Sequence, residues 1–257
     1  MSLVLYSVKD RIGYLTLNRP LKRNALNHEL ISELKTAFTR AEADAHVKVV
    51  VLKANGESFC AGADLAYLQE LQNFSYEENL ADSNHLKELF LQIYQLKKVV
   101  IAQVQGHALA GGCGLVTVCD FAFAVPEARL GYTEVKIGFI PAIVLVFLLR
   151  KISEQKAKQL LLSGDLVTAG VAMQLGLINE LAPAEALEGT VYSFAQKLIK
   201  NNSGQSMELT KKMISEVQSL PIGEALEYAA QMNATARLTD DCRKGIGAFL
   251  NKQEIVW

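Results

Sequence analysis

Two short segments rich in glycine and alanine come directly after apolar, strand-like runs and directly before helical sequence. They are 58–65, Ser-Phe-Cys-Ala-Gly-Ala-Asp-Leu, and 106–114, Gly-His-Ala-Leu-Ala-Gly-Gly-Cys-Gly. A strand that turns sharply into a helix leaves backbone N–H groups without partners, and these groups point at whatever lies over the helix N-terminus. Two such turns that face each other can hold an oxyanion. A single turn of this kind has a simpler explanation, which is close packing of a helix on a strand.

One carboxylate follows these segments in surroundings that suit acid–base chemistry. Glu134 lies between the apolar and small residues 130–133 and Val135. Burial there is expected to raise the pKa of its carboxyl, as suits a group that exchanges protons near neutral pH. The alternative is a surface glutamate on a loop.

The histidines, the cysteines and two aspartates form no recognised catalytic site. No two histidines have the spacing of metal ligands, and no two cysteines have the spacing of a metal or redox motif, so no metal is expected. The cysteines stand among apolar or small residues, which predicts buried, reduced thiols, and Cys113 has no basic neighbour to activate it. Asp64 is interpreted as a helix cap, and Asp120 and His107 as hydrogen-bonding partners of the backbone. The histidines are 28, 46, 85 and 107, and the cysteines are 60, 113, 119 and 242.

Alternating strands and helices are predicted to position these segments. Asn27 is the expected N-cap of the first helix, and 65–96 is predicted to be an acidic helical segment. After Pro183 the pattern is purely helical. The pattern therefore predicts an α/β core, which commonly binds its ligand beyond the carboxyl ends of the strands, followed by a helical region. The predicted strands are 13–17, 47–52, 99–104 and 121–125, and the late helices are 184–199, 206–217, 222–238 and 240–250.

The composition limits the class of protein. Half of the 257 residues are hydrophobic and 21% are charged, which is typical of a folded globular protein. The 26 lysines and arginines against 27 acidic residues give no basic field for nucleic acid. The longest apolar run, 142–149, is far shorter than the roughly 20 residues of a membrane span, so no membrane partner is expected. The first residues lack a signal-peptide pattern, and a cytoplasmic location is expected.

Six patterns run in order along the chain and together resemble the enoyl-CoA hydratase/isomerase (crotonase) superfamily over almost its whole length. This resemblance implies a core of repeated ββα turns in residues 1–193 and a helical trimerisation region in residues 194–257. It also implies assembly as a homotrimer or a dimer of trimers. The patterns are 18–27 (Asn-Arg-Pro to Asn-Ala-Leu-Asn), 59–65, 106–112, 119–120 (Cys-Asp), 131–138 (Gly-Tyr-Thr-Glu-Val-Lys-Ile-Gly) and 163–164 (Ser-Gly) with 172–177.

The resemblance further implies an acyl-CoA thioester as ligand, with no cofactor beyond the CoA of the substrate. The backbone amides of Ala63 and Gly111 would hold the thioester carbonyl, in agreement with the argument from the two turns, and Glu134 would deliver a proton. Lys22 and Arg23 would meet the CoA phosphates, and the late helix would reach the CoA of a neighbouring subunit. The expected ligand contacts are Lys22, Arg23, Ala25, Ala61, Gly62, Ala63, Asp64, Leu65, Gly111, Phe249 and Lys252.

The sequence departs from the family pattern at two places. The family's hydratases carry a further glutamate directly after the position of Cys113, where this chain has Gly114. Many relatives also have a Pro-Gly-x-Gly-Gly turn after the position of Glu134, where this chain has Pro141 followed by bulky residues in 142–147. The first departure puts simple hydration of crotonyl-type substrates in doubt. The second is expected to narrow or reshape the acyl pocket.

A bacterial branch of the family is similar at both places and is associated with 3-methylglutaconyl-CoA and related thioesters. The resemblance therefore implies reversible hydration of a branched or carboxylated 2-enoyl-CoA. Our physical hypothesis for the missing glutamate is that the substrate's own distal carboxylate orients the water. Three alternatives stay open: a Δ3,Δ2-enoyl-CoA isomerase using Glu134 alone, a decarboxylase of a glutaconyl-type thioester, and a non-catalytic acyl-CoA-binding paralogue. The presence of Glu134 argues against the last.

Overall fold

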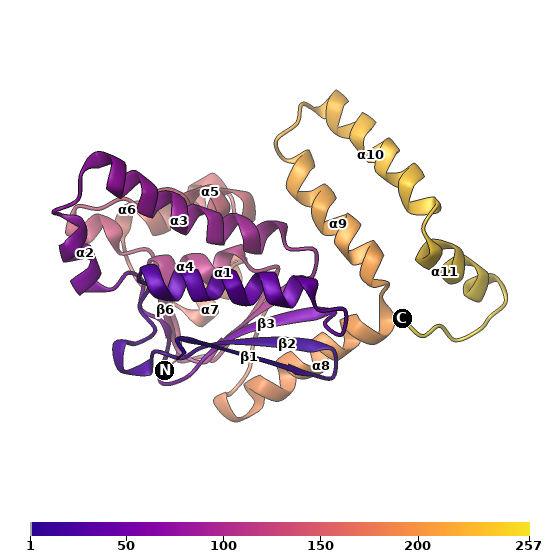
Figure 1. Ribbon diagram of the computed structural model, residues 1–257, viewed down its shortest axis with the longest axis horizontal. Helices are drawn as coiled ribbons and strands as arrows, with labels where there is room; N and C mark the ends of the chain where they lie inside the picture. The colour runs from indigo at the N-terminus through magenta and orange to yellow at the C-terminus, as the bar shows by residue number, and fades with distance from the viewer. Residues whose placement is uncertain (1) are drawn as a thin grey trace.

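Three consecutive ββα turns of the chain form the centre of the fold. The computed structural model describes residues 2–257 (Figure 1). In each turn, the first strand joins a six-stranded sheet and the second joins a four-stranded sheet. The strand pairs are β3 (Val49–Ala54) with β4 (Ser58–Cys60), β5 (Val99–Val104) with β6 (His107–Leu109), and β7 (Phe121–Ala124) with β8 (Arg129–Gly131).

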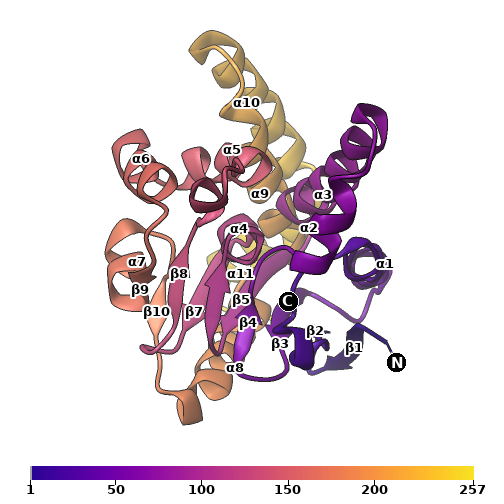
Figure 2. The ribbon, with the colours of Figure 1, turned by 90° about the vertical axis from the view of Figure 1, so that its left-hand side faces the viewer.

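The larger sheet has the order β1-β2-β3-β5-β7-β10, which Figure 2 shows from right to left. Only β1 (Val4–Lys9) and β2 (Ile12–Leu17) pair antiparallel; the other neighbours are parallel. All residues of β2 and β5 are buried, as expected for central strands covered on both faces. The smaller sheet has the order β4-β6-β8-β9, in which the first three strands are parallel. The remaining strands are β9 (Val167–Thr168) and β10 (Glu180–Leu181).

Helices cover both faces of the larger sheet (Figure 1). On one face, α1 (His28–Ala43) buries a stripe at helical spacing and begins at Asn27, whose side chain accepts a hydrogen bond from the Leu30 amide. On the other face, α8 (Ala184–Asn201) buries one residue per turn, Leu187, Val191, Ala195 and Ile199. The other elements of the core are η1 (Pro20–Lys22), α2 (Leu65–Leu71), α3 (Tyr76–Gln95), α4 (Gly111–Val118), η2 (Glu134–Ile137), α5 (Ala142–Lys151), α6 (Glu154–Ser163) and α7 (Ala169–Leu175).

The α/β architecture and the four strands predicted from the sequence are confirmed, with three corrections. The edge strand β1 was not predicted, and neither were the short strands β4, β6 and β8 to β10. The helical segment 65–96 is two helices, because Ser75 and Glu78 form a reciprocal capping box that starts α3 anew. No helix within residues 2–257 has the length and apolarity to cross a bilayer.

Three C-terminal helices extend from the core: α9 (Gly204–Val217), α10 (Ile222–Arg237) and α11 (Asp240–Leu250) (Figure 1). None of their residues is buried, and large apolar side chains such as Leu226 and Phe249 are 64% and 84% exposed. The domain boundary predicted after residue 193 falls inside α8 and stays a prediction. The homotrimer or dimer of trimers also stays a prediction.

Lysine side chains tie this C-terminal arm, α9 to α11, to the core. Lys211 of α9 places its ammonium 2.7 Å from Oδ2 of Asp120 and donates to the carbonyls of Lys98 (3.1 Å) and Ile93 (3.3 Å). Asp120 in turn accepts from the Val100 amide at the start of β5. One half-buried carboxylate therefore joins α9, β5 and the end of α4.

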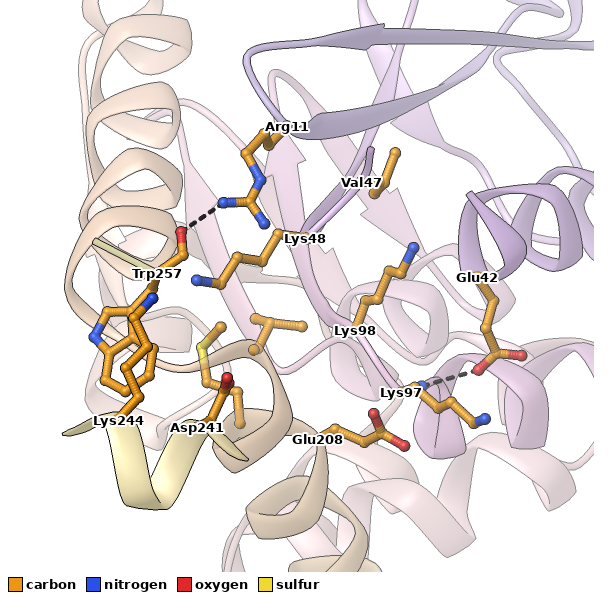
Figure 3. A pocket seen from close by; sticks show the side chains of 13 residues that line it. Arg11, Glu42, Val47, Lys48, Lys97, Lys98, Glu208, Asp241, Lys244 and Trp257 are labelled. Carbon is orange, nitrogen blue, oxygen red and sulfur yellow. Dashed lines mark hydrogen bonds between the residues drawn. The ribbon is translucent and has the colours of Figure 1, made fainter. Parts of the chain in front are cut away.

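Further contacts lie in the pocket between the arm and the sheet, at the end of α8 from which the arm begins (Figure 3). Lys48 donates to the carbonyls of Ile199 (2.7 Å) and Asn202 (2.6 Å), which end α8. Burial, together with the nearby Arg11 charge, lowers the pKa of Lys48 to about 8. Arg11 reaches across the pocket to the Trp257 carbonyl at 2.7 Å.

Replacing Lys211 by methionine is expected to loosen the arm, because Asp120 loses its ion pair and two carbonyls lose a donor. We expect a loss of about 2–4 kcal/mol in the free energy of unfolding, measured by urea denaturation at fixed protein concentration. Limited proteolysis is expected to cut within α9 to α11 sooner than in the wild type. The neighbouring Lys212→Met, at an exposed position, is the matched control, and an equal loss in both variants would contradict the anchor.

Candidate active site

The three parallel strands of the smaller sheet end side by side, and each is followed by one part of the candidate site. Ala63 follows β4, Gly111 follows β6 and Glu134 follows β8. Because the sheet order is β4-β6-β8, the chain segments leave neighbouring strands that lie about 4.8 Å apart. The repeated ββα turn thus carries residues from distant parts of the sequence to one edge of the sheet.

The first turn is held by the segment that precedes α1, in a way that leaves one amide unpaired. The Leu26 amide donates to the Gly62 carbonyl (2.7 Å), and the Asp64 amide donates to the Leu26 carbonyl (2.8 Å). These two bonds flank Ala63, which is exposed. Within residues 2–257 the Ala63 amide donates no hydrogen bond, so the predicted donor is available to a ligand.

The second turn leaves the first amide of α4 unpaired. Gly111 is the first residue of that helix, where an N–H has no carbonyl one turn earlier to accept it, and no acceptor for it occurs in the described chain. The preceding Ala110 donates to the Gly131 carbonyl at 2.7 Å, which ties the turn to β8. Ala110 has φ 49° and ψ −123°, a conformation that strongly favours glycine and costs an alanine on the order of 1–3 kcal/mol.

The two turns touch through their backbones. A Cβ on Gly62, which has φ +90°, would lie 2.9 Å from the Ala110 Cβ and 3.0 Å from the Leu109 carbonyl oxygen. A Cβ on Gly112 would lie only 2.2 Å from the Cys60 carbonyl oxygen. Both glycines are therefore required for the close approach of the two turns, one of which carries Ala63 and the other Gly111.

Glu134 presents a half-buried carboxyl beside these turns. Its Oε2 is buried and has no hydrogen-bond partner within residues 2–257. Burial raises the pKa of Glu134, and a bond from its own backbone amide offsets part of this effect. Two residues earlier, the fully buried Tyr132 hydrogen-bonds the Thr117 hydroxyl of α4 at 2.6 Å, which fixes the start of this segment against the second turn. The rise in pKa expected from the sequence is confirmed.

The position of the missing glutamate is occupied by apolar side chains. Gly114 lies in α4, one helical turn after Gly111, and is buried. A Cβ there would lie 2.3 Å from Cγ1 of Val144 and 2.8 Å from Cε1 of Phe90. Val144 is 4% exposed and Phe90 is fully buried, so no space is left for a side chain at this position.

Asp64 caps α2, as predicted, and also forms an ion pair that the sequence did not reveal. Its Oδ1 accepts from the Ala66 amide (2.9 Å), and its Oδ2 lies 2.5 Å from Nη1 of Arg19. Burial by itself raises the pKa of Asp64, but the bonds from Arg19 and the backbone amides outweigh it and lower the pKa. Arg19 also donates to the Ala25 carbonyl at 3.0 Å, so it braces both segments of the first turn.

Asn24 is a second residue of the site region for which the sequence predicted no role. It is fully buried in the left-handed conformation, with φ 53°. Its side chain accepts from the Arg19 amide (2.8 Å) and donates to the carbonyls of Asn55 and Ser58 (2.9 Å each). In the sequence, the only signal of this brace is an asparagine directly after a basic turn, because asparagine tolerates the left-handed conformation that such a turn can require.

The other predicted contacts divide into two groups. Lys22, Arg23 and Leu65 are exposed around the first turn, to which Ala25, Ala61 and Gly62 also belong. The contact of these residues with CoA stays a prediction. Phe249 lies in the last turn of α11 and Lys252 just beyond it, and α11 is on the opposite side of the molecule from α2 (Figure 1). This chain alone does not bring them to the turns, and their contact with the CoA of a neighbouring subunit stays a prediction.

The structural interpretation of several side chains is confirmed. His107 accepts from the Arg129 amide through Nδ1 (3.1 Å), and Asp120 accepts from the Val100 amide (2.7 Å). Burial raises the pKa of three cysteine thiols to about 12, which makes them inert. The three are Cys60, Cys113 and Cys119; Cys242 is half-buried, and all four are free thiols.

The histidines are less scattered in space than in sequence. The rings of His28 and His85 stack with their centroids 4.3 Å apart, which joins the start of α1 to α3. Burial, together with the charges of His28 and Lys35, lowers the pKa of His85. Their separation in the sequence gave no sign of this pair.

Comparison with known proteins places this geometry in one family. A family model described as enoyl-CoA hydratase/isomerase matches residues 7–257. A candidate enoyl-CoA hydratase of Thermus thermophilus is 42% identical over 246 residues, covering 95% of this chain and 96% of that protein. The 2,3-dehydroadipyl-CoA hydratase of Escherichia coli and the crotonyl-CoA hydratase of Syntrophomonas wolfei are each 32% identical over 254 residues, 98% of this chain and 97% and 96% of theirs.

Solved structures agree with this result. The crystal structure of an enoyl-CoA hydratase from Mycobacterium smegmatis superposes with a TM-score of 0.92 at 31% identity, covering 100% of this chain and 99% of that one. The similarity therefore extends over the core and the C-terminal arm together.

The ion pair below the first turn is expected to stabilise the fold in a pH-dependent way. Asp64→Asn leaves the largely buried Arg19 without its carboxylate, and we expect a loss of about 1–3 kcal/mol in the free energy of unfolding at pH 7. Because the folded state lowers the pKa of Asp64, this difference is present above the unfolded pKa of about 3.9 and is lost as the pH falls through the lower folded value.

The matched control is Glu154→Gln, which removes a carboxylate from an exposed pair with Lys158 and is expected to leave stability unchanged. Chemical denaturation of both variants between pH 3 and pH 7 measures the effect. A difference for Asp64→Asn that persists unchanged at the lowest pH would contradict the assignment.

Proposed function

The chain belongs to the enoyl-CoA hydratase/isomerase family, and we propose that it catalyses the reversible addition of water to a 2-enoyl-CoA. The observation that carries this proposal is the pair of unpaired amides, Ala63 and Gly111, at two turns in backbone contact. A thioester carbonyl oxygen that accepts from both amides is polarised, and an enolate oxygen is stabilised further. Loss of one such donor typically costs about 10²–10³ in rate.

In the proposed reaction, polarisation of the carbonyl makes Cβ of the enoyl group electrophilic. The oxygen of water adds to Cβ, and the π electrons move through Cα to the thioester oxygen to give an enolate held by the two amides. Glu134 then gives its proton to Cα, the carbonyl re-forms, and the second proton of the water leaves to a base. The raised pKa of Glu134 supports this role, because the carboxyl stays protonated to a higher pH.

The base that takes the proton from water is proposed to be the substrate. Gly114 offers no side chain, and Phe90 and Val144 take the space in front of it. A distal carboxylate on the acyl group would orient the water instead, which favours branched, carboxylated substrates such as 3-methylglutaconyl-CoA. Two equally similar relatives are named for different substrates, one carboxylated (2,3-dehydroadipyl-CoA) and one not (crotonyl-CoA), so this step rests on the geometry at Gly114.

A Δ3,Δ2-enoyl-CoA isomerase is the second candidate, and the single carboxylate favours it. An ionised Glu134 would remove a proton from Cα and return it to Cγ, with the same enolate held by the same amides. A non-catalytic acyl-CoA-binding protein is disfavoured, because it would have no use for a buried Glu134 oxygen without a partner.

The pH dependence of kcat/KM distinguishes the two reactions. If Glu134 donates the proton in hydration, kcat/KM falls as the pH rises through its raised pKa, since only the protonated form donates. An isomerase that starts with the ionised carboxylate shows the opposite, a rise with pH. Glu134→Gln is expected to lower kcat about 10²–10⁴-fold and to abolish the change of kcat/KM at the pKa of Glu134. The Kd for a saturated acyl-CoA is expected to stay within twofold. The exposed Glu127→Gln is the control and is expected to keep the wild-type profile.

The substrate is identified by product masses in heavy water with straight, branched and carboxylated enoyl-CoA thioesters. We expect 3-methylglutaconyl-CoA to gain one water and crotonyl-CoA to remain unchanged. Methylation of the distal carboxylate is expected to stop turnover while the ester still competes for binding.

Other outcomes of this assay identify other reactions. An unchanged rate on the methyl ester excludes the substrate as the base. A shifted double bond or deuterium exchange without added water indicates the isomerase, and loss of carbon dioxide indicates a decarboxylase. If the protein binds the thioesters but converts none of them, it is a non-catalytic acyl-CoA-binding protein.

A further inference from the structure

Two departures from the family pattern, which are separate in the sequence, meet in space. Gly114 stands where the family's hydratases have a glutamate, and Val144 belongs to the segment that replaces a glycine-rich turn. Building a Cβ on Gly114 brings it to 2.3 Å from Cγ1 of Val144. We propose that Val144 and Phe90 form an apolar plug in the volume of the missing glutamate, and that Val144 thereby determines which enoyl-CoA thioesters are hydrated.

The plug leaves no room even for a methyl group. Besides the contact with Val144, a Cβ on Gly114 would lie 2.8 Å and 3.1 Å from Cε1 and Cζ of Phe90. Separations below 3.0 Å require a neighbour to move, and a glutamate has four more heavy atoms to place. Gly114 is therefore required by packing as long as the plug is present.

The plug is held in place from both sides. Phe90 packs against Phe147 with ring centroids 5.9 Å apart, and Phe147 meets Tyr94 edge-on at 5.3 Å. At the other end of α5, Lys151 donates to the carbonyls of Thr117 (3.0 Å) and Cys119 (2.8 Å), which end α4. These contacts fix α5 against the helix that carries Gly114 and so oppose a withdrawal of Val144.

The consequence concerns specificity and rests on the proposed function. With the plug in place the protein contributes one carboxylate, Glu134, and water is oriented only by a substrate that carries its own polar group. Removing Cγ1 and Cγ2 of Val144 takes away the nearest obstacle to a side chain at position 114, and the Phe90 ring, at 2.8 Å, then has to shift by only a few tenths of an ångström. The two changes together are expected to convert the site to one that hydrates a plain enoyl-CoA.

The packing part is tested by a thermal denaturation cycle that needs no activity. Gly114→Ala is expected to lower Tm by about 3–10 °C in the wild-type background and by less than half as much in the Val144→Ala background. Val146→Ala, at a 45% exposed position of the same helix, is the control and is expected to leave the effect of Gly114→Ala unchanged. Equal shifts in the wild-type and Val144→Ala backgrounds would overturn the plug.

The specificity part is tested with kcat/KM for crotonyl-CoA and 3-methylglutaconyl-CoA. In Gly114→Glu with Val144→Ala, the ratio of crotonyl to 3-methylglutaconyl hydration is expected to rise at least tenfold over the wild type, and Gly114→Glu alone is expected to show no such rise. Gly114→Asp with Val144→Ala, which needs less volume, is the second design. The specificity role of Val144 would be overturned if the Tm measurements show coupling between positions 114 and 144 but the ratio of crotonyl to 3-methylglutaconyl hydration is unchanged in both double variants. If the wild type hydrates no enoyl-CoA at all, the proposed function fails, and the Tm cycle still decides whether the plug exists.

Discussion

The turns after β4 and β6 are in backbone contact, with no space for a methyl group between them, and the rest of the site depends on this contact. A Cβ on Gly112 would lie 2.2 Å from the Cys60 carbonyl oxygen, and one on Gly62 would lie 3.0 Å from that of Leu109. Parallel pairing of the two strands fixes their separation, and the glycines let the chain turn at once into α4. The strained Ala110 and the brace of Asn24 support the two turns that carry the Ala63 and Gly111 amides, the pair proposed to hold one thioester oxygen.

Charged side chains away from the candidate site have their hydrogen bonds satisfied, whereas the carboxyl of Glu134 does not. Lys151 and Lys211 lie against the core, and each has two or more carbonyl or carboxylate partners at the ends of helices or strands. Glu134, in contrast, keeps one buried oxygen without a partner. An unsatisfied acceptor is unfavourable for folding, and one that follows the same sheet edge as two unpaired amides is what is expected where a ligand completes the hydrogen bonds.

Long elements with strong periodicity could be predicted from the sequence, and contacts between elements could not. The strand β5 and the Asn27 cap of α1 lie where the pattern indicated, because hydrophobic spacing and capping are local properties. The strands β4, β6 and β8 have three residues each, too few for alternation to show, although the glycines after them marked the turns. The sequence revealed the absence of a glutamate at Gly114, but its filling by Val144 depends on which face of α4 meets α5.

The C-terminal arm follows the rest of the fold in the order of synthesis. Every strand of both sheets is complete by Leu181, and the helix that covers the second face of the larger sheet is complete by Asn201. The core can therefore fold on the ribosome before the arm has emerged, as domains generally do during translation. The exposed apolar side chains of the arm then reach solution only when a finished core is present to carry them, which shortens the time in which they are exposed together with an unfolded core.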